Sequence, residues 1–299
     1  MKTMFKTIYK ILIYVSIVFL VVYLYRFDYL CFNIIEFNYT YLVLSVFLLC
    51  LGFFVSMLSW WNILRVYNIN IKALFAVYSH GISIFAKYIP GKIWVILGRA
   101  YKVSSKSVSF KLISVLSLKE QLLYILLGLL ISFPSVFIYS NFSYYTIVVF
   151  VSILALSVLL FSKVFHKFVI NIFQRVFKKK LNVPLLEFNK SLKVSGFILI
   201  YWGLWIFAFY FFVKSVMPDV AFISAFAFPI SVCYGVLAII MPGGIGVREG
   251  IMVLFLTSTG INVETAVTIS VASRLWFISG EIFSFVLALI IKLNKKLFI

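Results

Sequence analysis

Long apolar runs separated by short polar or basic segments dominate the chain. Several of them approach the roughly 20 residues that a helix needs to cross a hydrocarbon layer about 30 Å thick. The pattern predicts an all-α, polytopic integral membrane protein with about six to eight transmembrane helices. We expect full spans at Ile11 to Tyr25, Tyr41 to Trp61, Leu112 to Phe133, Tyr144 to Phe161, Ser195 to Val213 and Val263 to Ile291.

Two further apolar runs are interrupted by helix breakers. Ala73 to Leu97 is broken at Pro90-Gly91, and Ala221 to Leu256 is broken between Pro242 and Gly250. The flanking charges and spans place both ends of the first run inside and both ends of the second outside. Non-helical backbone at membrane depth must be buried in protein or line a wet cavity. We therefore predict two re-entrant hairpins. The alternative for the first run is two short full spans. The alternative for the second run is that its first arm, which is long enough, crosses the membrane by itself.

The spans and hairpins form two units of opposite orientation. Within one domain covering residues 1–299, the first repeat spans residues 41–133 and the inverted repeat spans residues 195–291. The short match between Pro90-Gly91-Lys92-Ile93 and Pro242-Gly243-Gly244-Ile245 supports this arrangement. Paired broken segments in the two halves of a membrane protein point to a transport site.

Composition and charge agree with a membrane location. The chain is 64% hydrophobic and 12% charged, which excludes a water-soluble core. Its net charge of +19 is gathered in short segments between the spans, as the positive-inside rule requires, so we expect no nucleic acid partner. Bulky residues follow the first apolar run where a signal peptidase needs small ones. We therefore expect an uncleaved first span, a cell-membrane location and cytoplasmic N- and C-termini.

The segment between the two repeats, residues 163–193, is strongly basic. Its apolar residues recur at helical spacing opposite Lys163, Lys167 and Arg175. The spacing indicates an amphipathic helix on the cytoplasmic leaflet that holds anionic lipid head groups. Simple packing of a linker explains the same pattern equally well.

Residue types that hold metals or nucleotides are sparse. The three cysteines lack CxxC spacing, the two histidines lie far apart, and no P-loop of the form GxxxxGK[ST] is present. We therefore predict no metal, no cofactor, no catalytic residue and no ATP-driven transport by this chain alone.

Ionisable residues at membrane depth are the candidate chemistry. Each costs roughly 2.5 to 3.5 kcal/mol to insert, so each needs a partner or a task. We expect the backbone N–H groups of the Gly-rich break, the following helix N-terminus and Arg248 to bind an anionic group such as a lipid phosphate. The full set of predicted substrate-binding residues is Pro242, Gly243, Gly244, Gly246, Arg248, Glu249, Arg274, Glu281, Pro90, Gly91, Lys92, Arg99 and Glu120.

A structural interpretation of the same residues stays open. Buried ion pairs, either Arg248 with Glu281 or Arg274 with Glu249, would then only fix the helices. Pro90 would mark a helix kink, and Glu120 would be solvated near the cytoplasmic end of its helix.

The two motifs also bring a family into view. Lys87-Tyr88-Ile89-Pro90-Gly91-Lys92-Ile93-Trp94 with Arg99, Glu120, and Pro242 to Gly250 resemble the transmembrane family of lysylphosphatidylglycerol synthases, also called flippase-like proteins. The resemblance covers nearly the whole chain and implies the membrane part without the soluble synthase. It implies movement of an aminoacylated phospholipid between leaflets, and stand-alone relatives point equally to a glycolipid or polyprenyl-linked substrate.

The residues and the resemblance together favour a transporter over an enzyme. The leading expectation is a flippase-like protein that moves an anionic phospholipid or lipid-linked envelope precursor between leaflets, served by a separate synthase or glycosyltransferase. The alternatives are a membrane-embedded transferase in cell-envelope biosynthesis, or its partner subunit, and a non-catalytic scaffold. The sequence leaves the oligomeric state open.

Overall fold

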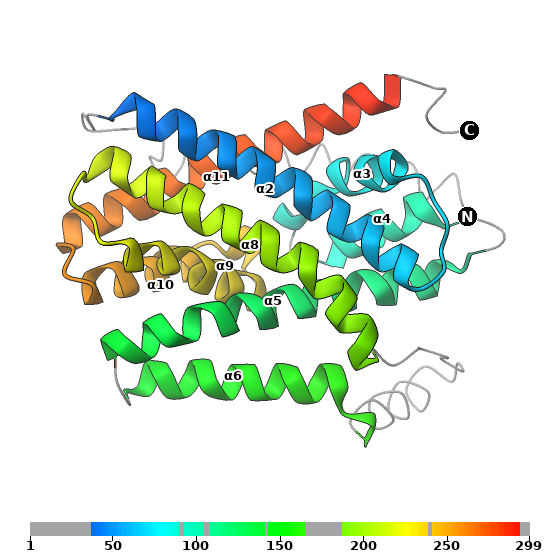
Figure 1. Cartoon of the computed structure of the whole chain (residues 1–299), viewed down its shortest axis with the longest axis horizontal. Helices are drawn as coiled ribbons and strands as arrows, with labels where there is room; N and C mark the ends of the chain where they lie inside the picture. The colour runs from blue at the N-terminus through cyan, green and yellow to red at the C-terminus, as the bar shows by residue number, and fades with distance from the viewer. Residues whose placement is uncertain are drawn as a thin grey trace.

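A computed structural model describes residues 37–89, 93–104, 108–140, 143–164, 187–238 and 241–293 (Figure 1). Every regular element in these ranges is a helix. Five are long and apolar enough to cross a membrane: α2 (Tyr39–Val66), α5 (Phe110–Ser140), α6 (Tyr144–Phe161), α8 (Phe188–Val216) and α11 (Val263–Leu293). The prediction of an all-α, multi-pass membrane protein is confirmed. The predicted first span, Ile11 to Tyr25, lies outside the described residues.

Both broken runs fold into short helices. The first contains α3 (Ala73–Gly81), the 3-10 helix η1 (Ile84–Tyr88) and α4 (Ile93–Val103). The second contains η2 (Phe222–Phe226), α9 (Ala227–Leu237), η3 (Pro242–Gly244) and α10 (Val247–Ser258). The 12 residues of α10 extend over about 18 Å, well short of the hydrocarbon thickness. In Figure 1, α3 and α4 lie beside one end of the long helices, and α9 and α10 lie beside the other end.

The two broken runs meet inside the protein. Tyr88, the last residue of η1, is buried and packs against the glycine turn of η3. A Cβ atom added to Gly243 would lie 3.0 Å from two carbons of the Tyr88 ring. Segments about 150 residues apart in the sequence are therefore in direct contact at the centre of the fold.

Close packing of α2, α8 and α11 holds this centre in place. A Cβ at Gly52 would come within 2.5 Å of the Trp205 ring, so the glycine lets α8 approach α2 closely. The Trp205 Nε1–H group donates to the Leu49 carbonyl oxygen at 3.3 Å. The Trp276 Nε1–H group of α11 donates to Ser45 Oγ at 2.7 Å, which ties the third helix to the same scaffold.

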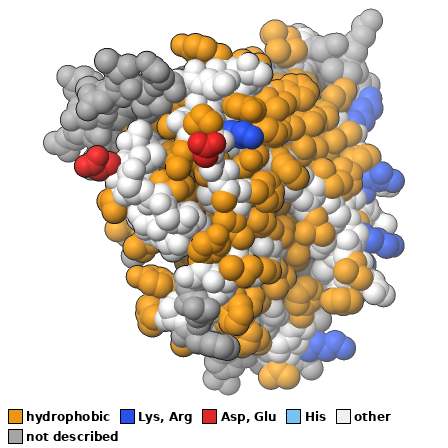
Figure 2. Space-filling model, turned by 60° about the vertical axis from the view of Figure 1, so that its left-hand side comes forward, with side chains coloured by type: hydrophobic (Ala, Val, Ile, Leu, Met, Phe, Trp, Pro, Cys, Tyr) orange, Lys and Arg blue, Asp and Glu red, His pale blue; other side chains and the backbone are white. Residues whose placement is uncertain are grey.

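The outer surface has the character expected of a membrane protein. Figure 2 shows hydrophobic side chains over most of one face, with most of the visible Lys and Arg side chains along one edge. Large apolar residues such as Val43, Ile147 and Val151 are more than half exposed. These side chains would face lipid, because such extensive apolar exposure is unfavourable in water. Most of the predicted basic linker, residues 163–193, lies outside the described residues.

Candidate functional site

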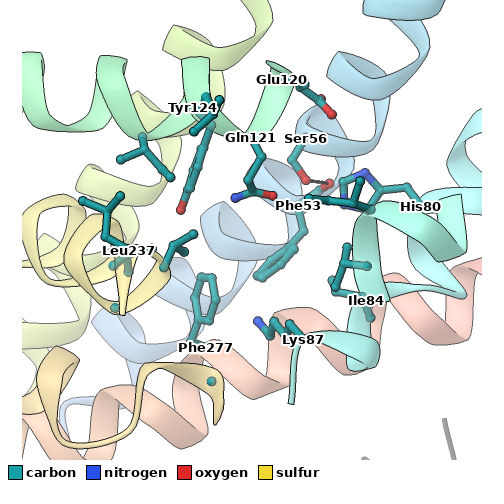
Figure 3. A pocket seen from close by; sticks show the side chains of 18 of the residues that line it. Phe53, Ser56, His80, Ile84, Lys87, Glu120, Gln121, Tyr124, Leu237 and Phe277 are labelled. Carbon is teal, nitrogen blue, oxygen red and sulfur yellow. Dashed lines mark hydrogen bonds between the residues drawn. The ribbon is translucent and has the colours of Figure 1, made fainter. Parts of the chain in front are cut away.

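A cavity of about 490 Å³ lies between the two broken runs and the helices around them. Its walls come from α2, α3, η1, α4, α5, α8, α9, η3, α10 and α11, and they are mostly apolar. Phe53, Trp205 and Phe277 are among the aromatic side chains of the lining. Lys87 from η1 and Gln121 from α5 point toward the interior from opposite walls (Figure 3). The cavity is thus an apolar chamber that contains a few polar groups.

Arg99 and Glu120 form an ion pair in one wall. Arg99 Nη1 donates to Glu120 Oε2 at 2.7 Å, and Nη2 donates to the Ser117 carbonyl oxygen at 3.3 Å. The guanidinium carbon also lies 4.5 Å from the centroid of the Trp60 ring. Arg99 is 2% exposed and Glu120 is 5% exposed. The alternative of a solvated Glu120 is therefore wrong, because packing of α4 on α5 buries the carboxylate beside an arginine.

Lys87 and Glu281 form a second ion pair between η1 and α11. Lys87 Nζ donates to Glu281 Oε1, and the Tyr88 hydroxyl donates to Glu281 Oε2 at 2.8 Å. Both carboxylate oxygens are therefore occupied, and Glu281 is fully buried. The alternative in which Arg248 pairs with Glu281 is wrong, since η1 supplies the cation instead.

Glu249 and Arg274 form a third ion pair that closes the glycine break. Arg274 Nε donates to Glu249 Oε1, and Arg274 Nη1 donates to the Gly243 carbonyl oxygen at 2.9 Å. The Gly246 N–H group donates to Glu249 Oε2 at 2.7 Å, so the carboxylate caps the first turn of α10. This pair is the second of the two ion pairs that the sequence offered as alternatives. It joins η3, α10 and α11 across the break.

Arg248 differs from these basic residues because no carboxylate pairs with it among the described residues. The residue is 5% exposed, and its guanidinium carbon lies 5.1 Å from the Phe228 ring centroid and 4.7 Å from that of Phe277. Its Nε and Nη2 atoms are buried without a hydrogen-bond partner in the described part of the chain. Arg248 also lines the cavity. Buried donors without a hydrogen-bond partner cost free energy. A ligand that accepts hydrogen bonds from Arg248 would remove this cost, so Arg248 is a candidate ligand contact.

The glycines of the break serve the backbone more than a ligand. Gly243, Gly244 and Gly246 have φ angles of 59°, 73° and 79°, which other residues adopt at a cost. A Cβ at Gly244 would lie 2.6 Å from the Gly235 carbonyl oxygen, so η3 packs tightly on α9. The Gly244 N–H group donates to the Met241 carbonyl oxygen at 3.0 Å, and that of Gly246 is bound to Glu249. Both N–H groups are therefore already hydrogen-bonded within the protein, and the binding of an anion by these glycines stays a prediction.

The structure brings most of the predicted site residues to one place. Gly243, Arg248, Arg274, Arg99 and Glu120 line the cavity, and Glu249 and Glu281 pair with lining residues. Pro242 begins η3, whereas Pro90, Gly91 and Lys92 lie outside the described residues. Their role in binding a substrate stays a prediction.

Sequence reasoning missed several polar groups of the cavity. Lys87, His80 and Gln121 line the cavity, Tyr88 donates to Glu281 beside it, and none of the four was among the predicted site residues. For Lys87 a signal existed, because a lysine three residues before the Pro90-Gly91 break at membrane depth needs a partner. Its partner, Glu281, is 194 residues away, and no local pattern connects the two.

The long apolar helices define a multi-pass membrane protein, and its internal cavity is mostly apolar with buried ion pairs in and beside its walls. Comparison with family models agrees, since residues 7–278 match the family described as the lysylphosphatidylglycerol synthase TM region. The match covers nearly the whole chain, which therefore belongs to that family. It is a membrane region linked to lipid modification or flipping. Comparison with curated proteins gave no match, and neither did comparison with solved structures.

Proposed function

We propose that this protein translocates an anionic phospholipid or an anionic lipid-linked envelope precursor between the leaflets of the cell membrane. The observation that carries the proposal is Arg248, a buried guanidinium that lines the cavity and lacks a carboxylate partner among the described residues. A charge in such surroundings is strongly stabilised by a counter-ion. Arginine matches the planar, bidentate geometry of phosphate and carboxylate groups.

The walls of the cavity favour a lipid over a soluble anion. Phe53, Ile84 and Ile125 are typical of its lining, and they offer apolar contact but no hydrogen bonds. An acyl or prenyl chain gains free energy of about 25 cal/mol per Å² of apolar surface that it removes from water. A hydrated inorganic anion gains nothing from such walls and loses its hydration shell.

The arrangement of the short helices supports an inverted-repeat mechanism. We propose that α3 to α4 and η2 to α10 are re-entrant elements that enter from opposite faces and meet where Tyr88 touches Gly243. Their positions at opposite ends of the long helices and their insufficient length favour this interpretation (Figure 1). Transporters of this plan bind substrate near the bilayer midplane, between the repeats.

Single-cysteine labelling from either side of the membrane tests the hairpins. In a protein whose native cysteines are replaced, cysteines at Asn70 and Ser109 should react from the cytoplasmic side, and cysteines at Asp219 and Val263 from the other. All four parent residues are exposed. Labelling of Asn70→Cys and Ser109→Cys from opposite sides would show that the first element crosses the membrane.

The distribution of basic residues along the chain bears on the orientation of the protein in the membrane and on its partners. We propose cytoplasmic termini, anionic lipid bound at residues 163–193, and a substrate delivered by a separate synthase or glycosyltransferase. The basic character of these segments supports the orientation. A reporter that is active only in the cytoplasm, fused to each terminus in turn, tests it, and an inactive fusion at either end would contradict it.

Leaflet exchange in vesicles tests the function itself. The purified chain is reconstituted with fluorescent phosphatidylglycerol, and a membrane-impermeant quencher reports how fast lipid of the inner leaflet becomes accessible. We expect rapid exchange by the wild type, slow exchange by Arg248→Gln, and wild-type exchange by Arg65→Gln. Arg65 is the matched control because it is exposed at the end of α2, outside the cavity. Exchange at the rate of protein-free vesicles for anionic phospholipids and lipid-linked precursors alike would refute translocation, and formation of a covalently altered lipid would support the transferase.

A further inference from the structure

Among the described residues, the basic side chains around the cavity outnumber the carboxylates by one. In the described part of its lining there are four Lys or Arg side chains, Lys87, Arg99, Arg248 and Arg274, and three carboxylates pair with them, Glu281, Glu120 and Glu249. One positive charge therefore remains among the described residues, and it is that of Arg248. His80 adds none, because its Nδ1 lies 3.4 Å from Arg99 Nη1, a group that can only donate, so this nitrogen carries no proton.

From this surplus we infer that the cavity selects lipids whose head group carries one net negative charge, as a single phosphodiester with no compensating amine. The inference rests on the proposed function and specifies its substrate class. One phosphodiester neutralises Arg248 and leaves no charge unpaired in a low-dielectric space. Gln121 adds a neutral amide that suits the hydroxyl groups of an uncharged head group such as glycerol.

Lipids with an amine fit this cavity poorly. An ammonium group needs a carboxylate, and the described carboxylates around the cavity are already engaged. Glu281 accepts from Lys87 and Tyr88, Glu249 accepts from Arg274 and the Gly246 N–H group, and Glu120 accepts from Arg99. A zwitterionic or aminoacylated phospholipid would have to break one of these ion pairs. We therefore expect discrimination against both.

Lipids with two or more negative charges fit poorly for the opposite reason. A polyprenyl diphosphate brings a second charge, and among the described residues that line the cavity no basic side chain is left over for it. Within the described lining, it would have to draw Lys87, Arg99 or Arg274 away from its carboxylate, which would then be buried alone. The ion pairs thus set the charge that the cavity accepts, and Arg248 supplies the contact.

Binding and exchange are measured in parallel to test this inference. Purified protein is titrated with phosphatidylglycerol, phosphatidylethanolamine, lysyl-phosphatidylglycerol and a polyprenyl diphosphate, and the same lipids are followed in the vesicle assay. We expect phosphatidylglycerol to bind at least about tenfold more tightly than the others, the change that one charge-assisted hydrogen bond produces. Soluble glycerol phosphate should not compete at equal concentration, because it lacks the apolar chain.

Two variants change the surplus of positive charge around the cavity without removing Arg248. Glu281→Gln and Glu120→Gln each raise it by one positive charge, and either should shift the binding preference toward the diphosphate by about tenfold or more. A wild type that binds the aminoacylated or diphosphate lipid as well as phosphatidylglycerol, or folded variants with unchanged preference, would overturn the inference. Selective binding without any exchange would refute translocation and leave the charge selection standing.

Discussion

Replacing Arg248 by methionine should weaken lipid binding and spare the fold, whereas the same change at Arg274 should damage the fold. Arg248 makes no ion pair with a described residue, and its contacts are with the rings of Phe228 and Phe277. Methionine has a similar length and packs well against aromatic rings. Arg248→Met therefore removes a buried unpaired charge and keeps the packing.

The expected magnitudes of the two changes differ clearly. A hydrogen bond to a charged group contributes about 1.5–3 kcal/mol, so Arg248→Met should weaken binding of phosphatidylglycerol roughly 10- to 150-fold. Arg274→Met leaves Glu249 without its cation and the Gly243 carbonyl oxygen without its donor. Breaking a buried ion pair by removing one partner costs about 3–5 kcal/mol of stability.

Thermal unfolding in detergent and lipid titration of the same preparations measure both effects. Arg248→Met should unfold at or above the wild-type temperature, and Arg274→Met should unfold well below it. Equal destabilisation by the two substitutions would refute the reasoning, because it would show that Arg248 holds the helices together as Arg274 does. Unchanged lipid binding by Arg248→Met would refute the assignment of the ligand contact.

Three further substitutions test the surroundings of the cavity. Gly244→Ala forces a Cβ against the backbone of α9 at positive φ, so unfolding should show a loss of at least roughly 1–3 kcal/mol, and wild-type stability would contradict the tight turn. Glu120→Ala leaves Arg99 buried without its carboxylate and should cost about 3–5 kcal/mol in the same assay, whereas a neutral effect would mean that water reaches the pair. Tyr88→Phe removes one charge-assisted hydrogen bond to Glu281 and should cost about 1.5–3 kcal/mol, with no change expected if that contact does not form in the membrane.

The long helices could be predicted from the sequence because hydropathy reports them directly. The predicted span Tyr144 to Phe161 coincides with α6, since it is strongly hydrophobic, contains no charged residue and is bounded by polar residues. The predicted span from Ser195 begins seven residues later than α8, which starts at Phe188. Polar residues such as Asn189 and Lys190 lower the hydropathy of that first stretch but are compatible with a helix that extends beyond the apolar layer.

Most charged residues of the candidate site could be predicted from the sequence, but only some of the ion pairs between them could. The free-energy cost of placing an ionisable residue at membrane depth identified four of them, Arg248, Glu249, Arg274 and Glu281. They could not choose among partners on different helices, and Lys87 was left out of the predicted site altogether. The pairing depends on how η1 and α11 come together in three dimensions, which no helical spacing records.

The glycine break is another feature that the sequence located but could not explain. The sequence identified Gly243, Gly244 and Gly246 as positions where a close approach is possible. It could not tell whether a ligand or the protein itself makes the approach. Tyr88 and α9 occupy the space beside Gly243 and Gly244, so steric need within the fold accounts for these two positions.

A lipid-bound structure of the protein in a bilayer disc containing phosphatidylglycerol tests the central claim most directly. We predict a phosphate group in the cavity, with its oxygens within hydrogen-bonding distance of Nε and Nη2 of Arg248 and with the other three ion pairs intact. A cavity without lipid in which Arg248 is paired with a carboxylate of the chain, or a phosphate bound elsewhere, would contradict the account.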